Sequence, residues 1–264
     1  MIRSPEQFVS YSAYLMAAIR AQETERRDRI FSDPFAAQLA GKEAMSLLDK
    51  QVTPQDQNFV VIRTRMFDDL LLKHAPPIKQ VVILAAGMDT RAFRLALPRD
   101  LQLYELDYAE ILEYKNVELA NVMPKCERHA IAADLTKLWT PRLFAAGYDS
   151  SQASIWLLEG LLMYLNEADA HTLLQTVSRM TAPGSHIGLD LVNRKAVIDN
   201  DPYRVYFRSG VDIPEVVLSD YGWTTQVFQP GDDGASFGRC KPPPLDRDIP
   251  DTARTFIIHA TKDS

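Results

Sequence analysis

The stretch LAAGMDTRAFRL, residues 84–95, directly follows the short apolar run VVI. An apolar strand that ends in a turn of small residues and opens into a helix is a common place for a ligand to bind. A dinucleotide site would show the pattern GxGxxG, which lets the backbone approach the pyrophosphate at a helix N-terminus. The corresponding positions here are Ala85, Gly87 and Thr90, and Asp89 adds a negative charge to the first helical turn. The turn therefore favours a ligand with a ribose and no phosphate over a nicotinamide dinucleotide.

From residue 78 onward, short apolar segments alternate with segments that have helical spacing. Seven of the apolar segments have the length and composition of strands: 80–86, 101–107, 127–134, 154–160, 186–192, 223–228 and 254–261. Short apolar strands separated by helices predict a mostly parallel sheet with helices on both faces. We expect the last two strands to close one edge of the sheet as an antiparallel pair. The predicted fold class is α/β and Rossmann-like, with seven strands.

Residues 1–77 differ in character from the remainder of the chain. Apolar residues recur there at spacings of three and four, as in FVVIRTRMFDDLLL (59–72), and a Pro-Pro pair ends this section. We therefore expect a helical N-terminal cap on a Rossmann-like core of residues 78–264, the two forming a single domain. Within this core, the polar, aromatic and basic stretch near 193–221 is interpreted as an insertion between the fifth and sixth strands.

The composition narrows the possible partners. The chain has 264 residues, of which 46% are hydrophobic and 24% charged, and its net charge is −6. These proportions are typical of globular proteins, and the lack of a long basic run argues against a nucleic-acid or membrane partner. No CxxC pair or His/Cys cluster occurs and the five histidines are scattered, so no metal site is predicted. We expect a cytoplasmic protein.

Three predicted strands carry a carboxylate at or next to their last residue, namely Asp107, Asp134 and Glu159. In a doubly wound sheet, ligands lie beyond the carboxyl ends of the strands. Each carboxylate could instead cap the following helix, but three such positions together favour binding. Asp107 follows the turn by about twenty residues, the spacing at which a carboxylate accepts hydrogen bonds from ribose hydroxyls in dinucleotide sites.

Several longer motifs occur in order along nearly the whole chain. RTRMFDD (63–69) precedes the turn at 84–95, which is followed by YELDYAEI (104–111), AADLT (132–136) and EGLLMYL (159–165). Together with the opening AAIRAQET and SDPFAAQLAG and the closing ASFGR, these motifs resemble the leucine carboxyl methyltransferase-like family. The resemblance implies an S-adenosylmethionine-dependent O-methyltransferase with a Rossmann-like class I methyltransferase fold, and S-adenosylmethionine as its cofactor.

The resemblance also implies a role for each residue that matches a family motif. Arg65, assisted by Arg20, would bind the methionyl carboxylate, and Asp107 would bind the ribose. Asp134 would contact the adenine, and Glu159 would lie near the methionyl amine. The complete set of cofactor-binding candidates is Arg20, Arg65, Ala85, Gly87, Asp107, Asp134, Leu135 and Glu159.

A structural alternative remains open for the arginines of the RTRMFDD motif. Arg63 and Arg65 have the three- or four-residue spacing at which they could pair with Asp68 and Asp69 on one exposed helix face.

The acceptor side of the site is predicted from the insertion, because this region lies over the substrate in the family. Tyr203, Arg204, Tyr206 and Arg208 are the substrate-binding candidates, since they offer aromatic surface and cations for an acidic group. A solvated helix face would have the same composition. Tyr164, just beyond a ligand-bearing strand end, is the candidate catalytic residue, with packing in the core as its alternative.

These residues predict methyl transfer by in-line displacement to a carboxylate or hydroxyl of a small molecule, such as a polyketide-like secondary metabolite. A carboxylate is already ionised at neutral pH and needs no general base, whereas a phenol or enol does. Three alternatives stay open: methylation of a protein C-terminal carboxylate, a nicotinamide-dependent oxidoreductase, and a non-catalytic subunit with this fold. Nothing in the sequence predicts the oligomeric state.

Overall fold

The computed structural model describes residues 5–198, 204–240 and 244–264. Seven strands form one sheet in the order β3-β2-β1-β4-β5-β7-β6. The strands are β1 (Gln80–Leu84), β2 (Gln102–Asp107), β3 (Glu127–Ala132), β4 (Ile155–Leu158), β5 (His186–Val192), β6 (Trp223–Phe228) and β7 (Thr255–Lys262). The first five are mutually parallel, whereas β7 pairs antiparallel with both β5 and β6. The predicted seven-stranded, mostly parallel α/β fold is confirmed.

Alternation along the central strands divides the core between the two faces of the sheet. In β1 every residue is buried, and Val81 and Ile83 pack in one cluster while Val82 and Leu84 pack in the other. Because both faces of the central strands are buried, their sequences are continuous apolar runs.

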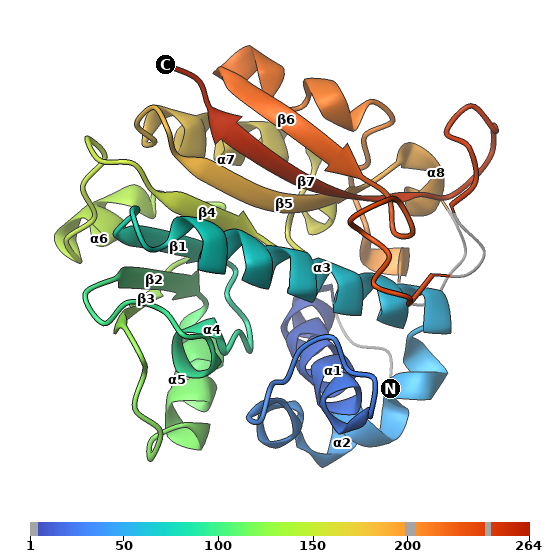
Figure 1. Ribbon diagram of the computed structural model, residues 1–264, viewed down its shortest axis with the longest axis horizontal. Helices are drawn as coiled ribbons and strands as arrows, with labels where there is room; N and C mark the ends of the chain where they lie inside the picture. Colours follow the sequence, from blue (N-terminus) through green and yellow to red (C-terminus); the bar gives the residue numbers. More distant parts are fainter. Residues whose placement is uncertain (1–4, 199–203, 241–243) are drawn as a thin grey trace.

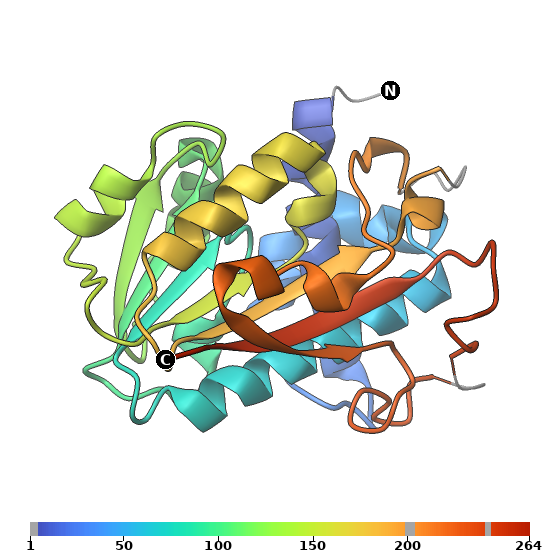
Figure 2. The same cartoon turned by 90° about the horizontal axis from the view of Figure 1, so that it is seen from above.

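Helices cover both of these faces, and Figure 2 shows α3 and α7 on opposite sides of the sheet. The first cluster lies under α1–α5, and the second lies under α6 and α7. The bounds are α1 (Pro5–Glu25), α2 (Ala36–Gln51), α3 (Pro54–His74), α4 (Arg91–Arg94), α5 (Ala109–Glu118), α6 (Thr140–Ala145), α7 (Glu167–Arg179) and α8 (Arg194–Val197).

The helices α1–α3 precede the first strand. The long helix α3 runs across one face of the sheet, and α1 and α2 lie beside each other below it in Figure 1. No helix in the described ranges is long and apolar enough to cross a membrane.

The connection from β5 to β6 has α8 and three short 3₁₀ helices, η2 (Arg204–Tyr206), η3 (Pro214–Val216) and η4 (Ser219–Tyr221). It is held against the segment after β4, where the 3₁₀ helix η1 (Leu162–Tyr164) lies. The backbone N–H of Arg208 donates to the carbonyl of Met163 at 2.7 Å, and the hydroxyl of Ser209 donates to that of Leu162 at 3.1 Å. These bonds fix the connection beside the carboxyl end of β4.

Candidate active site

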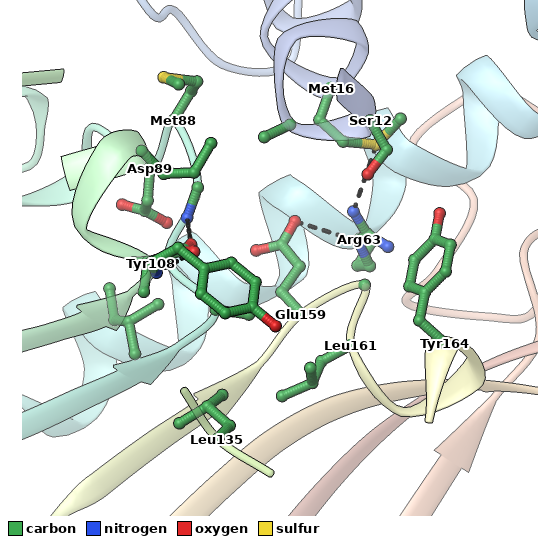
Figure 3. A pocket seen from close by; sticks show the side chains of 18 of the residues that line it. Ser12, Met16, Arg63, Met88, Asp89, Tyr108, Leu135, Glu159, Leu161 and Tyr164 are labelled. Atoms are coloured by element: carbon green, nitrogen blue, oxygen red, sulfur yellow. Dashed lines mark hydrogen bonds and ion pairs between the residues drawn. The ribbon is translucent and has the colours of Figure 1, made fainter. Parts of the chain in front are cut away.

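A cavity of about 380 Å³ lies at the carboxyl ends of β1, β2 and β4. Its volume is within the range of small-molecule sites. The turn after β1 forms one wall, and Ser12 and Met16 of α1 contribute to another (Figure 3). Tyr206, in the connection between β5 and β6, also lines the cavity. The N-terminal helices and that connection therefore both take part in enclosing the space above the sheet.

The turn after β1 brings backbone close to the cavity. Ala85 and Gly87 both have positive φ, 52° and 48°. A Cβ atom added to Gly87 would lie 3.1 Å from the Cβ of Ala13 in α1. Only glycine fits this close approach without displacing the helix, which explains the single glycine of the turn.

Asp107, the last residue of β2, is buried against this turn. Its Oδ2 accepts the backbone N–H of Gly87 at 2.6 Å, and its Oδ1 accepts the N–H of Tyr108 at 2.7 Å. Burial raises the pKa of the carboxyl, although these two hydrogen bonds act in the opposite direction. Because a carboxylate has about four acceptor sites, Asp107 can still accept hydrogen bonds from a ligand in the cavity.

Arg63 is the centre of a buried ionic network at the cavity wall. Its Nε donates to Oε1 of Glu159 at 3.0 Å, and its Nη1 donates to Oδ2 of Asp190 at 2.8 Å. The other oxygen of Asp190 accepts the backbone N–H of Gly160 at 2.6 Å. The network thereby links α3, the loop after β4 and the middle of β5.

Glu159 has a second arginine partner, Arg91, whose Nη1 lies 2.8 Å from Oε2. Burial alone would raise the pKa of Glu159, but Arg91 and Arg63 lower it below its ordinary value. Arg91 also pairs with Asp89 and with Asp68, the latter at 2.8 Å. Glu159 is therefore an ionised side chain at neutral pH, and it points toward Arg63 in Figure 3.

Arg20 lines the cavity from α1. Its Nε donates to Asp33 at 2.8 Å, and its Nη2 donates to the carbonyl of Met88 at 2.6 Å. These bonds connect the N-terminal helices to the turn after β1 and hold the guanidinium beside it.

The residues after β3 contribute a mainly apolar wall. Ala133 and Leu135 line the cavity, as does Tyr108. The side chain of Asp134 does not: its Oδ1 accepts the hydroxyl of Thr136 at 2.7 Å, and its Oδ2 lies 3.0 Å from Nζ of Lys137. The Asp134 carboxylate thus belongs to a local turn beside the cavity, and its expected contact with the adenine stays a prediction.

Arg65, the other arginine of the RTRMFDD motif, lies apart from the cavity. Its guanidinium pairs with Asp69 at 2.8 Å, four residues along α3, and donates to the carbonyl of Ile30 at 2.7 Å. It is outside the cavity lining, whereas Arg63, two residues earlier, lies within it. Arg65 therefore pairs with an aspartate along its own helix, and Arg63 is the arginine of this motif that lines the cavity.

The burial pattern of α3 carries a signal that could have identified Arg63. Val60, Arg63, Thr64, Phe67 and Leu71 are all buried and share one helix face at three- and four-residue spacing. An arginine within an otherwise apolar stripe is expected to have a buried acidic partner.

Three of the expected acceptor-side residues line the cavity: Tyr164, Tyr206 and Arg208. Figure 3 shows Tyr164 and Tyr108 on either side of the Arg63–Glu159 pair. Arg204 is instead bound to Asp56 of α3, with 2.7 Å between Nη2 and Oδ1, outside this lining. It anchors η2 to α3, and its expected role as a substrate contact stays a prediction. Tyr203 lies outside the described residues.

The described lining of the cavity contains neither histidine, cysteine nor lysine. Its three acidic side chains, Asp89, Asp107 and Glu159, all accept hydrogen bonds or ion pairs from neighbouring groups. The arrangement therefore suits binding and orientation better than proton abstraction by a free base.

The chain is similar to known and putative methyltransferases. The leucine carboxyl methyltransferase family matches residues 13–178. A Saccharopolyspora erythraea protein named "Putative S-adenosyl-L-methionine-dependent methyltransferase" is 34% identical over 259 residues, covering 88% of each chain. A similarly named protein of a Parafrankia species is 40% identical over 194 residues, covering 69% of this chain and 63% of that protein. The match thus spans less than two thirds of the Parafrankia protein.

Solved structures share the fold at low sequence identity. An N-methyltransferase from Bradyrhizobium japonicum, in complex with S-adenosyl-L-homocysteine, has a TM-score of 0.52 at 13% identity. The similarity covers 87% of this chain and 97% of that one. A protein from Streptomyces avermitilis has a TM-score of 0.59 at 14% identity, covering 93% and 96%.

Proposed function

Because the chain belongs to the leucine carboxyl methyltransferase family, we propose that it methylates an oxygen of a small molecule, with a carboxylate as the acceptor. Its cofactor is S-adenosylmethionine. That cofactor supplies a methyl group bonded to a positively charged sulfur. The acceptor oxygen would attack the methyl carbon from the side opposite the sulfur, and S-adenosylhomocysteine would leave. The protein has to align the acceptor oxygen with the methyl group and exclude water.

The residues around the cavity fit the three parts of the cofactor. Asp107 would accept hydrogen bonds from the ribose hydroxyls, with Gly87 allowing the close approach. The apolar wall with Leu135 would contact the adenine. Arg63, with Arg20, would supply positive charge for the methionyl carboxylate. Glu159 would lie near the amine, since it is a buried anion in the same lining.

One observation carries the choice of a carboxylate acceptor: every acidic side chain in the described lining is already engaged, and no histidine, cysteine or lysine lies there. A phenol needs a group that removes or stabilises its proton, whereas a carboxylate is ionised at neutral pH. A site without a free base is therefore better suited to carboxylate methylation.

The acceptor would enter on the side of Tyr164, Tyr206 and Arg208. Arg208 is exposed, lines the cavity, and has no ion-pair partner among the residues that the structure describes. A guanidinium at this position would attract an acidic molecule, while the tyrosines offer flat surface for an aromatic or polyketide-like body. The hydroxyl of Tyr164 would orient the acceptor oxygen. These features favour a small secondary-metabolite acid.

The test is methyl transfer from isotope-labelled S-adenosylmethionine to a matched panel of aromatic carboxylic acids and phenols. Methyl esters release labelled methanol in mild base, whereas methyl ethers retain the label. We expect base-labile label on the acids. Base-stable label confined to the phenols would contradict the carboxylate assignment and favour hydroxyl methylation.

A further inference from the structure

Three of the chain's five histidines, scattered in the sequence, come together in the fold. His74 is the last residue of α3, His186 the first of β5, and His259 lies in β7 opposite Gly188. One ring nitrogen from each can be chosen so that all three lie within 4.8 Å of one another. Figure 1 shows these parts of α3, β5 and β7 at the same end of the sheet. The sequence spacing predicted no metal site, because it gave no hint of this contact.

The three imidazoles are packed closely enough to share a ligand. The rings of His74 and His186 have centroids 3.7 Å apart, and Nε2 of His259 lies 3.3 Å from Nδ1 of His186. In a tetrahedral zinc site with Zn–N bonds of about 2.05 Å, ligand nitrogens lie roughly 3.3 Å apart. The 3.3 Å between the ring nitrogens of His186 and His259 matches this separation, and the three ligand nitrogens lie within 4.8 Å of one another.

One ring nitrogen of the cluster has no partner among the residues that the structure describes. Nε2 of His74 is buried and forms no hydrogen bond. Buried polar atoms are nearly always satisfied, so an unsatisfied one calls for an unseen water or ion. All three side chains are nevertheless partly exposed, which leaves a route for an ion from solvent.

The chemistry of the cluster matches transition metals. Neutral imidazole is the commonest metal ligand in proteins, and the cluster offers three of them. The group contains no carboxylate, which disfavours Ca²⁺ and Mg²⁺ relative to Zn²⁺, Co²⁺, Ni²⁺ or Cu²⁺.

We propose that His74, His186 and His259 bind one imidazole-preferring divalent transition-metal ion. The ion joins the end of α3 to two neighbouring strands, so its effect is to stabilise the contact between helix and sheet. His186 begins β5, whereas Asp190, which contacts Arg63 of the active-site network, lies four residues later, about 13 Å along the strand. The metal site is thus separate from the methyl-transfer cavity.

The experiment uses untagged, full-length protein freed of metal with a chelator and titrated calorimetrically with ZnCl₂ at pH 7.5. Co²⁺ provides a second probe, because tetrahedral Co²⁺ has intense visible absorption. We expect one ion per chain. His259→Gln should weaken binding by about 10-fold or more, while His171→Gln and His129→Gln, outside the cluster, should leave it unchanged.

Thermal unfolding provides a readout that does not depend on activity. A ligand that binds only the folded state raises Tm, so Zn²⁺ should raise the Tm of the wild type and of His171→Gln but not that of His259→Gln. Affinity for S-adenosylhomocysteine should be equal in all of them, which separates this site from the proposed function. Failure of the wild type to bind one ion, or equal Zn²⁺ binding by His259→Gln, would overturn the proposal.

Discussion

Nε of Arg63 lies 3.0 Å from Oε1 of Glu159, although the two residues are 96 positions apart in the chain. The pair connects the middle of α3 to the loop that follows β4. Because both side chains line the cavity, the helices that precede the Rossmann-like core are part of the candidate site. Stability and cofactor binding should therefore respond together to changes at Arg63.

Replacing Arg63 by methionine should destabilise the fold. The change leaves Asp190 buried without a cation and removes one of the two arginine partners of Glu159. Breaking such a buried pair costs about 3–5 kcal/mol. Urea unfolding followed by circular dichroism measures the loss.

Arg65→Met is the matched control on the same helix. Its partner Asp69 is half exposed, so that ion pair contributes no more than about 1 kcal/mol. Even with the hydrogen bond to Ile30, the loss should be smaller than for Arg63→Met. Equal destabilisation by the two changes would contradict the assignment of Arg63 to the buried network.

Arg208→Gln should raise KM for an acidic acceptor about 10-fold or more, because a charge-assisted contact contributes about 1.5–3 kcal/mol. The kcat and the affinity for S-adenosylhomocysteine should stay near wild-type values, since Arg208 is on the acceptor side. Arg204→Gln, which breaks the 2.7 Å contact to Asp56, should instead lower Tm. An unchanged KM in Arg208→Gln would remove this residue from the acceptor site.

Acid should destabilise the protein partly through Glu159. Its folded-state pKa lies below the ordinary value of 4.5, despite burial, because Arg91 and Arg63 favour the ionised form. A depressed pKa contributes stability above the unfolded-state value, and that stability is lost as pH falls through the folded-state value. Glu159→Gln should thus be less stable than wild type at pH 7, and the difference should shrink below about pH 4.5. A constant difference from pH 7 to pH 3 would contradict this linkage.

Ala85 provides a prediction about the turn itself. Its φ of 52° is in the left-handed region, which costs a residue with a Cβ about 1–2 kcal/mol. Ala85→Gly removes this cost, but glycine also raises the entropy of the unfolded chain, which lowers stability. We therefore expect a Tm equal to or slightly above that of the wild type. Ala85→Val should lower Tm clearly, because β-branched residues are poorly tolerated at positive φ. Equal Tm values for the two variants would argue against this conformation.

The positions of strand ends were predictable because they depend on short-range pattern. Apolar runs give the strands, and the parallel order brings their carboxyl ends to one edge. Asp107 and Glu159 accordingly line one cavity. Asp134 follows β3 in the same way, but its carboxylate accepts a hydrogen bond from the hydroxyl of Thr136, two residues later. A local turn of this kind decides where a side chain points, and strand prediction contains no information about it.

Contacts between distant segments were not predictable in the same way. Choosing Arg63 over Arg65 requires knowing which face of α3 is against the sheet, and the choice becomes clear only from the buried stripe. The contact among His74, His186 and His259 depends on how α3 crosses β5 and β7. Neither contact leaves a spacing motif in the sequence.

The central claim is that the cavity beside Asp107 holds the cofactor. Its most direct test is calorimetric titration of S-adenosylhomocysteine into the wild type and the variants Asp107→Asn and Asp134→Asn. The Tm of each free protein checks that it is folded. Loss of a hydrogen bond to a charged group weakens binding by about 10- to 100-fold. We predict one-to-one binding by the wild type, a loss of that size in Asp107→Asn, and near-normal affinity in Asp134→Asn. Equal affinity of wild type and a folded Asp107→Asn variant, or no binding by the wild type, would contradict the account.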